Sequence, residues 1–333
     1  MIDLHENARM LFGTAWAVFV ALSFAVAIGP AMWSQANNEP VPESRALDAQ
    51  EQRGLDVYVS EGCVACHTQQ VRPIAADEPF GRPSVAGDYA RLDRQGVFAG
   101  TPALLGSQRT GPDLANVGER QPSSSWHLIH LYNPRAVVED SVMPAHPWLF
   151  REVDNPDDGQ TLVEMPAPYG PDDKKLVATE RAEALVAYLK SLKQPPLPEG
   201  SEAASEDSSA EESKSPGASL YEQKCASCHG SDGSGVPQTF PPLAGDPVVT
   251  ADKPDDHVRI ILEGMQGVSI DGVDYSAAMP GFADSLSDAD IAAIVNHERT
   301  SWGNDAPTIT AEEVAELREA VEAGTDETGG DDE

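Results

Sequence analysis

The stretch Cys63-Val-Ala-Cys-His67 decides how this sequence folds, and it has a second copy at Cys225-Ala-Ser-Cys-His229. The two motifs together contain all 4 cysteines of the 333-residue chain. In each motif two thiols, three positions apart, are followed at once by an imidazole. This spacing lets both thiols add to the vinyl groups of one porphyrin while the histidine lies under its iron. The sequence therefore predicts two covalently bound haem c groups.

Other uses of paired cysteines account for less of the pattern. A thioredoxin-like redox pair needs no adjacent histidine and belongs in a βαβ pattern, which we do not find here. A structural zinc site would have to bring the two pairs together from distant parts of the chain. A disulfide within each pair would leave His67 and His229 unexplained. Haem attachment explains the thiols and the histidines together.

Methionines followed by proline lie downstream of each motif and are candidates for the sixth iron ligand. A methionine ligand raises the reduction potential and leaves no open position for substrate. Near the first motif both Met143 and Met165 precede a proline, and we favour Met143. Near the second we favour Met279, which precedes the closing helix, and we assign Met265 to packing.

Further polar groups are candidates for supporting roles around the iron. Pro112 and Pro242 are expected on the histidine side of each haem, where a backbone carbonyl can fix the imidazole tautomer. Arg72 is either a partner for a haem propionate or an ordinary surface arginine. His127 and His130 offer an alternative pair of iron ligands, although their i, i+3 helical spacing is more typical of packing.

Residues 11–33 form an uncharged segment long enough to cross a lipid bilayer. At about 1.5 Å per residue such a helix spans roughly 34 Å, against a hydrocarbon core of about 30 Å. A cleaved signal peptide is the alternative, but its apolar region would be about 7–15 residues long and would follow a basic start. Because haem c is attached outside the cytoplasm, we expect a single-pass anchor in the cell (inner) membrane with both haem domains on the extracytoplasmic, periplasmic side.

The remaining chain repeats one plan twice, and the expected fold is mainly α. Each copy has a short helix, the CxxCH motif, a proline-bearing loop, a Met-Pro pair and a closing amphipathic helix. Thr310 and Glu313 form a capping box that predicts one more short helix. The predicted segments are a cytoplasmic N-terminus (1–10), a transmembrane helix (11–33), a tether (34–50), a first cytochrome c-like domain (51–193), a flexible acidic linker (194–217), a second cytochrome c-like domain (218–302) and an acidic tail (303–333).

The charge balance excludes one class of partner. The chain has 55 acidic and 22 basic residues, which gives a formal net charge of −33. Nucleic acid is not an expected partner because no basic face is available to neutralise phosphates. We interpret the acidity as a general property of the surface, as in salt-loving organisms, in preference to a specific docking patch.

Four motifs in the first half of the chain resemble one known family. They are Cys63-Val-Ala-Cys-His-Thr-Gln-Gln-Val-Arg-Pro73, Gly106-Ser-Gln-Arg-Thr-Gly-Pro-Asp-Leu114, Trp126-His-Leu-Ile-His-Leu131 with Pro134-Arg135, and Ser141-Val-Met-Pro144 followed by Pro147-Trp-Leu149. Their order behind one N-terminal anchor resembles the mono-haem subunit (CcoO or FixO) of cbb3-type cytochrome c oxidases, over roughly residues 1–193. The resemblance implies that the Met143 position supplies the axial ligand. It also implies packing beside a haem-copper catalytic subunit, and other oxidase subunits, in a complex that reduces oxygen to water.

The chain departs from that family's pattern after residue 193, where the family subunit normally ends. The second domain resembles an ordinary class I cytochrome c, on the strength of Tyr221, Cys225–Gly230, Pro242–Gly245 and Met279–Phe282. Such domains deliver electrons in many oxidases and dehydrogenases. We expect electrons from an extracytoplasmic donor, such as a soluble cytochrome c or a quinol-oxidising complex, to reach the haem at His229, then the haem at His67, then the catalytic subunit. The chain itself would be an electron carrier without catalytic residues.

Other functions remain open at this point. The chain could be the cytochrome c subunit of another membrane reductase, such as nitric oxide reductase, although the Gln-Gln-Val-Arg-Pro run speaks against it. A stand-alone di-haem peroxidase would need one open iron site, and the Met-Pro pairs argue against that. A haem-based sensor would bind carbon monoxide readily in the reduced state, which a six-coordinate iron resists.

Overall fold

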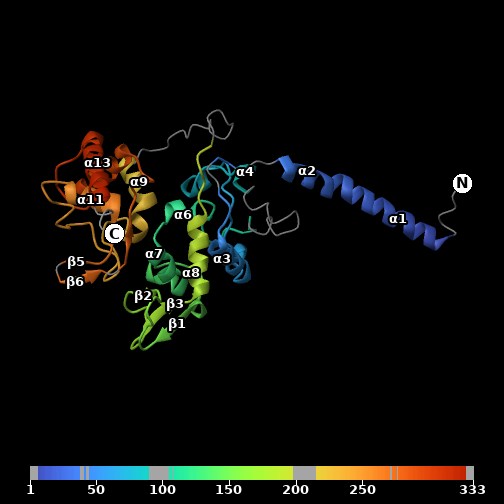
Figure 1. Cartoon of the computed structure of the whole chain (residues 1–333), viewed down its shortest axis with the longest axis horizontal. Helices are drawn as coiled ribbons and strands as arrows, with labels where there is room; N and C mark the ends of the chain where they lie inside the picture. Colours follow the sequence, from blue (N-terminus) through green and yellow to red (C-terminus); the bar gives the residue numbers. More distant parts are fainter. Residues whose placement is uncertain are drawn as a thin grey trace.

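The computed structural model describes residues 7–37, 41–42, 45–89, 105–106, 108–197, 215–270, 272–275 and 277–327. Within these ranges the protein is mainly α with small antiparallel sheets, so the predicted fold class is confirmed (Figure 1). Most of the predicted linker (198–214) and the end of the predicted tail (328–333) lie outside the described residues. The division of the chain into segments stays a prediction.

The N-terminal segment is one long helical rod, drawn in blue in Figure 1. Helix α1 (Ala8–Ser23) continues through a π-helical turn, η1 (Phe24–Ile28), into α2 (Gly29–Asn37). The stretch Ala8–Trp33 contains an 18-residue window with a mean hydropathy of 2.2 and is long enough to span a membrane. The helix begins three residues before the expected start and runs beyond the expected end. Pro30 explains the π-helical turn, because its ring removes one N–H and clashes with the carbonyl four residues earlier.

The region around the first CxxCH motif, called the first domain below, is built on two crossing helices, α3 (Ala49–Ser60) and α8 (Glu180–Ser191). Asp48 and Glu51 form a capping box that starts α3. At the crossing, a Cβ at Gly54 would overlap the carbonyl of Ala184, so only glycine permits this close approach. The remaining elements are η2 (Cys63–Ala65), η3 (Ala75–Phe80), α4 (Ala86–Tyr89), α6 (Val117–Arg120), α7 (Ser124–Tyr132), η5 (Pro134–Ala136) and η6 (Pro147–Leu149).

A small sheet that the sequence did not predict precedes α8. It consists of β1 (Phe150–Val153), β2 (Leu162–Val163) and β3 (Lys175–Ala178), in the antiparallel order β1-β3-β2. The inner strand β3 has Val177 fully buried and Leu176 nearly so. The sheet therefore closes one end of the first domain's core, at the bottom of Figure 1.

The region around the second CxxCH motif, called the second domain below, repeats the helix crossing with different residues. Helix α9 (Pro216–Lys224) packs on α12 (Asp288–Thr300), and a Cβ at Gly217 would overlap the carbonyl of Ala293. The predicted cap is confirmed, because Thr310 and Glu313 bond reciprocally before α13 (Ala311–Glu327), which is longer than expected. The other elements are α10 (Ala226–His229), α11 (Asp255–Glu263), the pair β4 (Gly264–Met265) with β7 (Met279–Pro280), and the pair β5 (Val268–Ile270) with β6 (Val273–Tyr275).

Candidate functional site

A cavity of about 630 Å³ lies beside the first CxxCH motif. Cys63, Cys66 and His67 line it together with Met143, as the sequence predicts for one site. Most of the remaining wall is apolar and comes from elements far apart in the sequence. These residues include Phe80, Leu114, Trp126, Leu131, Leu185 and Leu189.

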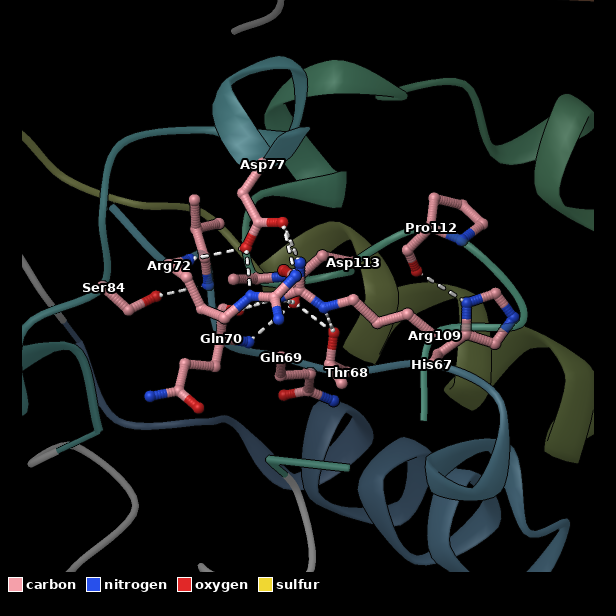
Figure 2. A network of polar contacts seen from close by, with 12 residues as sticks. His67, Thr68, Gln69, Gln70, Arg72, Asp77, Ser84, Arg109, Pro112 and Asp113 are labelled. Atoms are coloured by element: carbon pink, nitrogen blue, oxygen red, sulfur yellow. Dashed lines mark hydrogen bonds and ion pairs between the residues drawn. The ribbon is translucent and has the colours of Figure 1, made fainter. Parts of the chain in front are cut away.

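The imidazole of His67 is fixed by a backbone carbonyl. Its Nδ1 lies 2.9 Å from the carbonyl oxygen of Pro112 (Figure 2). A carbonyl oxygen can only accept a hydrogen bond, so Nδ1 carries the proton and Nε2 keeps a lone pair for a metal. Burial lowers the pKa of His67, which also favours the neutral ring. The ring packs on Gly111, where any Cβ would overlap it.

The second CxxCH motif lines a separate cavity of about 370 Å³. Cys225, Cys228 and His229 contribute to its wall, and the Nδ1 of His229 lies 2.9 Å from a proline carbonyl. That carbonyl belongs to Pro241, which corrects the expectation for Pro242. The turn between Val236 and Phe240 closes through two backbone hydrogen bonds of 2.9 and 2.8 Å, and the next residue, Pro241, is the one within reach of the ring. Pro242 lines the same cavity.

The four candidate methionines are placed differently in the two domains. Met143 lines the first cavity, whereas Met165 packs against the first domain's core and is not among the described residues that line the cavity. Met279 and Met265 both line the second cavity, because they are partners across the β4–β7 pair. Ligation by Met143 and Met279 stays a prediction. In the second domain the alternative ligand, Met265, lines the same cavity as Met279, whereas Met165 is not among the described residues that line the first cavity.

The two histidines of α7 also lie beside the first cavity. His127 has its Nε2 2.9 Å from the carbonyl of Gln121, so this nitrogen already has a partner. The ring of His130 stacks on Trp126 with 4.5 Å between centroids, and its buried Nδ1 has no hydrogen bond within the described residues. Burial lowers the pKa of His127 to about 4 and that of His130 to about 3. Both rings are therefore neutral at physiological pH.

Arg72 forms an ion pair away from the first cavity. Its Nε and Nη2 donate to the two carboxylate oxygens of Asp77, each at 3.0 Å (Figure 2). Arg109 also pairs with Asp77, whose side chain is 1% exposed. These contacts do not support a propionate role for Arg72, which is not among the described residues that line the first cavity. Sequence reasoning missed Asp77, a carboxylate five residues after the arginine it binds.

A second buried carboxylate, Asp113, connects two of the sequence motifs near His67, residues 63–73 and residues 106–114. It accepts hydrogen bonds from the Thr68 hydroxyl at 2.6 Å and from the backbone N–H of Gln70 at 2.8 Å (Figure 2). Because Asp113 directly follows Pro112, the hydrogen bonds that fix Asp113 also fix the Pro112 carbonyl that accepts from His67. Arg109 donates to Thr68 as well, and thereby ties Asp77 and Asp113 into one network.

The chemistry of the donors suits haem c better than zinc. Burial raises the pKa of Cys63 to about 11 and that of Cys228 to about 12, so these thiols stay protonated at neutral pH. Zinc requires thiolates, whereas addition to a vinyl group consumes an S–H. Within the part of the chain that the structure describes, no three His, Cys, Asp or Glu side chains converge as a metal site. Two apolar cavities with neutral imidazoles and a methionine fit an iron porphyrin.

Comparison with known families agrees with this geometry. The family described as cytochrome c oxidase, mono-haem subunit/FixO, matches residues 3–195, more than half of the chain. The chain belongs to the FixO family. Residues 212–297 match a second family, described as cytochrome c oxidase, cbb3-type, subunit III. The predicted resemblance to FixO with an added C-terminal cytochrome c domain is thereby confirmed.

Individual relatives share parts of this FixO-family chain. The cytochrome c subunit of alcohol dehydrogenase (quinone) from Gluconacetobacter polyoxogenes is 42% identical over 41% of the chain and 30% of its own length. The chain thus spans about a third of that relative. Cytochrome c-552 from Thermus thermophilus is 41% identical over 31% of the chain and 83% of its own length. These relatives support a membrane cytochrome c that carries covalent haem and transfers electrons.

Proposed function

We propose that this FixO-family protein is the di-haem c subunit of a cbb3-type haem-copper oxidase. An extracytoplasmic donor, such as a soluble cytochrome c or a quinol-oxidising complex, delivers electrons to the His229 site. They pass to the His67 site and then to the catalytic subunit that reduces oxygen to water. One observation carries the proposal: both CxxCH histidines have the same carbonyl-fixed imidazole beside an apolar cavity, in a chain of this family.

The residues of the chain hold and tune the two centres. The carbonyls of Pro112 and Pro241 hold each imidazole in one orientation and one tautomer. The apolar linings keep water away, so little solvent has to reorganise when a centre changes charge. When bound, haem c supplies a one-electron iron couple whose potential is raised by a methionine ligand such as Met143 or Met279.

The proposal includes an orientation in the membrane. The helix Ala8–Trp33 anchors the chain in the cell membrane. Both haem domains lie on the extracytoplasmic side, where haem c is attached, and in a Gram-negative cell this is the periplasm. The partners are then the catalytic and other subunits of the oxidase within the membrane and an electron donor outside the cytoplasm.

A second candidate is a cytochrome c subunit of a membrane dehydrogenase complex. It is favoured by the likeness to the cytochrome c subunit of alcohol dehydrogenase (quinone) reported above. The two functions differ in the direction in which electrons leave the chain. An oxidase subunit gives electrons to an oxygen-reducing centre, whereas a dehydrogenase subunit accepts them from a substrate-oxidising one.

Purification of the full chain from its own membranes in mild detergent separates these functions. We expect a haem-copper subunit to co-purify and the preparation to consume oxygen with a reduced donor. Co-purification of a substrate dehydrogenase without any oxygen-reducing subunit would overturn the proposal. A chain without residues 194–333 should consume oxygen more slowly with the natural donor, and unchanged donor oxidation would remove the second domain from the electron route.

A further inference from the structure

The second haem-attachment motif touches the wall of the first haem cavity. Ser227, which lies between Cys225 and Cys228, receives two hydrogen bonds from the first domain. The indole Nε1 of Trp126 donates to its carbonyl oxygen at 3.0 Å, and Nε2 of Gln121 donates to its hydroxyl at 2.7 Å. Figure 1 shows α9 of the second domain beside α6 of the first, where Lys224 pairs with Glu119.

The donors on the first domain belong to the haem cavity itself. Trp126 and Gln121 both line the first cavity, and Gln121 also lines the second. Trp126 stacks on His130, which lines the first cavity too. A continuous set of contacts therefore leads from the first cavity, through an indole ring, to the backbone of the second CxxCH motif.

Apolar packing and one ion pair surround these hydrogen bonds. Phe240 belongs to the first domain's core cluster, and Cys228 and Val236 pack against it. At the edge, the Lys224 ammonium lies 2.8 Å from the Glu119 carboxylate, with only 12% and 28% of the two side chains exposed. Apolar packing combined with a charge pair is a composition typical of the contacts between protein domains.

We propose that the Trp126–Ser227 contact is the place where one electron crosses between the two haem centres, and that the Lys224–Glu119 pair holds the two domains in this docked arrangement. The inference rests on the proposed function, which requires electrons to reach the His67 site from the His229 site. In the step, the centre of the second domain is oxidised by one electron and that of the first is reduced by one. No proton or atom moves.

The interface accounts for the use of a tryptophan at this position. Phenylalanine would fill the same apolar space, but it could not donate to Ser227. The indole therefore contributes both a ring that bridges the two domains and an N–H that fixes the distance to the second motif. Trp148 offers a matched contrast, because its indole N–H bonds Glu61 at 2.9 Å on an exposed face of the first domain.

The test is the rate of electron equilibration between the two haems of the full chain, started by a ruthenium photoreductant. We expect Trp126→Leu, and to a smaller extent Trp126→Phe, to slow equilibration, while Trp148→Phe leaves it unchanged. Haem content by pyridine haemochrome verifies that each variant is loaded and folded. Equal rates in Trp126→Leu and in the unmodified chain would overturn the role of the indole.

A charge reversal tests the docked arrangement without using electron transfer. We expect Lys224→Glu to separate the domains, seen as a larger radius of gyration in small-angle X-ray scattering and faster amide hydrogen exchange around Ser227. The docking equilibrium should weaken at least about tenfold, which corresponds to about 1.4 kcal/mol. Lys224→Glu combined with Glu119→Lys should restore docking in part, because Lys193 also lies 3.6 Å from Glu119.

The results distinguish this inference from the proposed function. The photoreductant bypasses the natural donor and the catalytic subunit, so a failure of either partner does not affect the measurement. Unchanged scattering, exchange and equilibration in Lys224→Glu would overturn the docking contact. A chain that docks and equilibrates as expected but fails to associate with an oxidase would overturn the proposed function alone.

Discussion

The two CxxCH domains orient their histidine rings in the same way but support that orientation with different contacts. Each holds an imidazole with a proline carbonyl at 2.9 Å, and each crosses two helices at a glycine. In the first domain the carbonyl of Pro112 is anchored by Asp113 and a network of buried charges. In the second, the carbonyl of Pro241 follows a hydrogen-bonded turn beside buried Phe240. The contact between the histidine ring and a proline carbonyl is thus common to both domains, whereas the residues that hold that carbonyl in place differ.

The two supports differ in how much sequence change they tolerate. The network depends on two buried carboxylates, Asp77 and Asp113, and removing an arginine that pairs with them leaves a buried negative charge with fewer partners, which is costly. The turn of the second domain depends on backbone hydrogen bonds that many sequences can form. The support for the first imidazole should therefore tolerate fewer substitutions than the support for the second.

The largest expected effect comes from removing one pair of thiols at a time. Cys225→Ser with Cys228→Ser should reduce covalent haem from two to one per chain, and Cys63→Ser with Cys66→Ser should do the same. Each domain carries its own attachment motif, so neither loss should affect the other. Pyridine haemochrome spectra of the denatured chain give the count. Two haems in either variant, or bound zinc, would contradict the attachment chemistry.

The next largest effect concerns the sixth ligand of each iron, because the two domains differ in which other methionine lies near the candidate ligand. Met143→Leu should open the first iron, so that reduced protein binds carbon monoxide and the reduction potential of that haem falls. Met165→Leu should change neither, because this side chain packs in the core. Optical titration under carbon monoxide checks both variants.

In the second domain the same experiment has a sharper outcome. Met279→Leu should open the iron, and Met265→Leu should not. If Met279→Leu still resists carbon monoxide while Met143→Leu binds it, Met265 has taken the ligand position from the neighbouring strand. That result would show that the second site tolerates an exchange of ligand that the first does not.

These positions also mark how far sequence reasoning reaches. The CxxCH motifs, the closing helices and the Thr310 cap depend on local spacing, so they could be predicted from adjacent residues. The sequence predicts Pro242 as the source of the carbonyl at His229, one residue beyond the Pro241 that the structure shows, because local spacing does not reveal which of two adjacent prolines faces the ring. Helical caps need only nearby residues, whereas the orientation of a carbonyl depends on the turn before it.

Long-range contacts were beyond prediction for a related reason. Strand β3 lies between β1 and β2, and nothing in its four residues specifies that order. The partner of Arg72 is Asp77, which a short-range search could have found from the spacing of opposite charges. The contact between Trp126 and Ser227 joins residues from different domains, and no local pattern indicates it.

The charge network of the first domain can be broken at Asp77. Asp77→Asn removes the charged partner of Arg72 and Arg109 and should destabilise the first domain by about 1.5–3 kcal/mol, the range for hydrogen bonds to charged groups. The second domain should be unaffected. Urea unfolding followed by hydrogen exchange resolves the two domains. Asp56→Asn, on the exposed side of α3, is the control and should change little.

The same carboxylate predicts a dependence on pH. Hydrogen bonds from Arg72 and Arg109 hold the pKa of Asp77 well below its ordinary value of about 4. A depressed pKa means that the stabilisation is complete above about pH 4 and is lost as the pH falls further. The unmodified first domain should therefore lose stability below about pH 4, and Asp77→Asn should lose less over that range. Parallel acid titrations of both forms would contradict this assignment.

The smallest effect tests the packing behind the first imidazole. Gly111 precedes Pro112 and touches the His67 ring, whereas the residue before Pro241 is Phe240. Gly111→Ala should push the ring away from the Pro112 carbonyl, lower stability by about 1–3 kcal/mol and alter the spectrum of the first haem only.

Gly159→Ala is the control for that substitution. Its φ of 85° makes any side chain strained, but a Cβ there meets no atom within 4 Å. This variant should lose stability without any change in the haem spectrum. If Gly111→Ala also loses stability without a change in the haem spectrum, Gly111 is needed only for its backbone conformation. Close packing on the His67 ring is then not a requirement of the first site. If the spectrum changes in Gly111→Ala alone, close packing on the imidazole is a requirement that the second domain, with phenylalanine at this place, does not share.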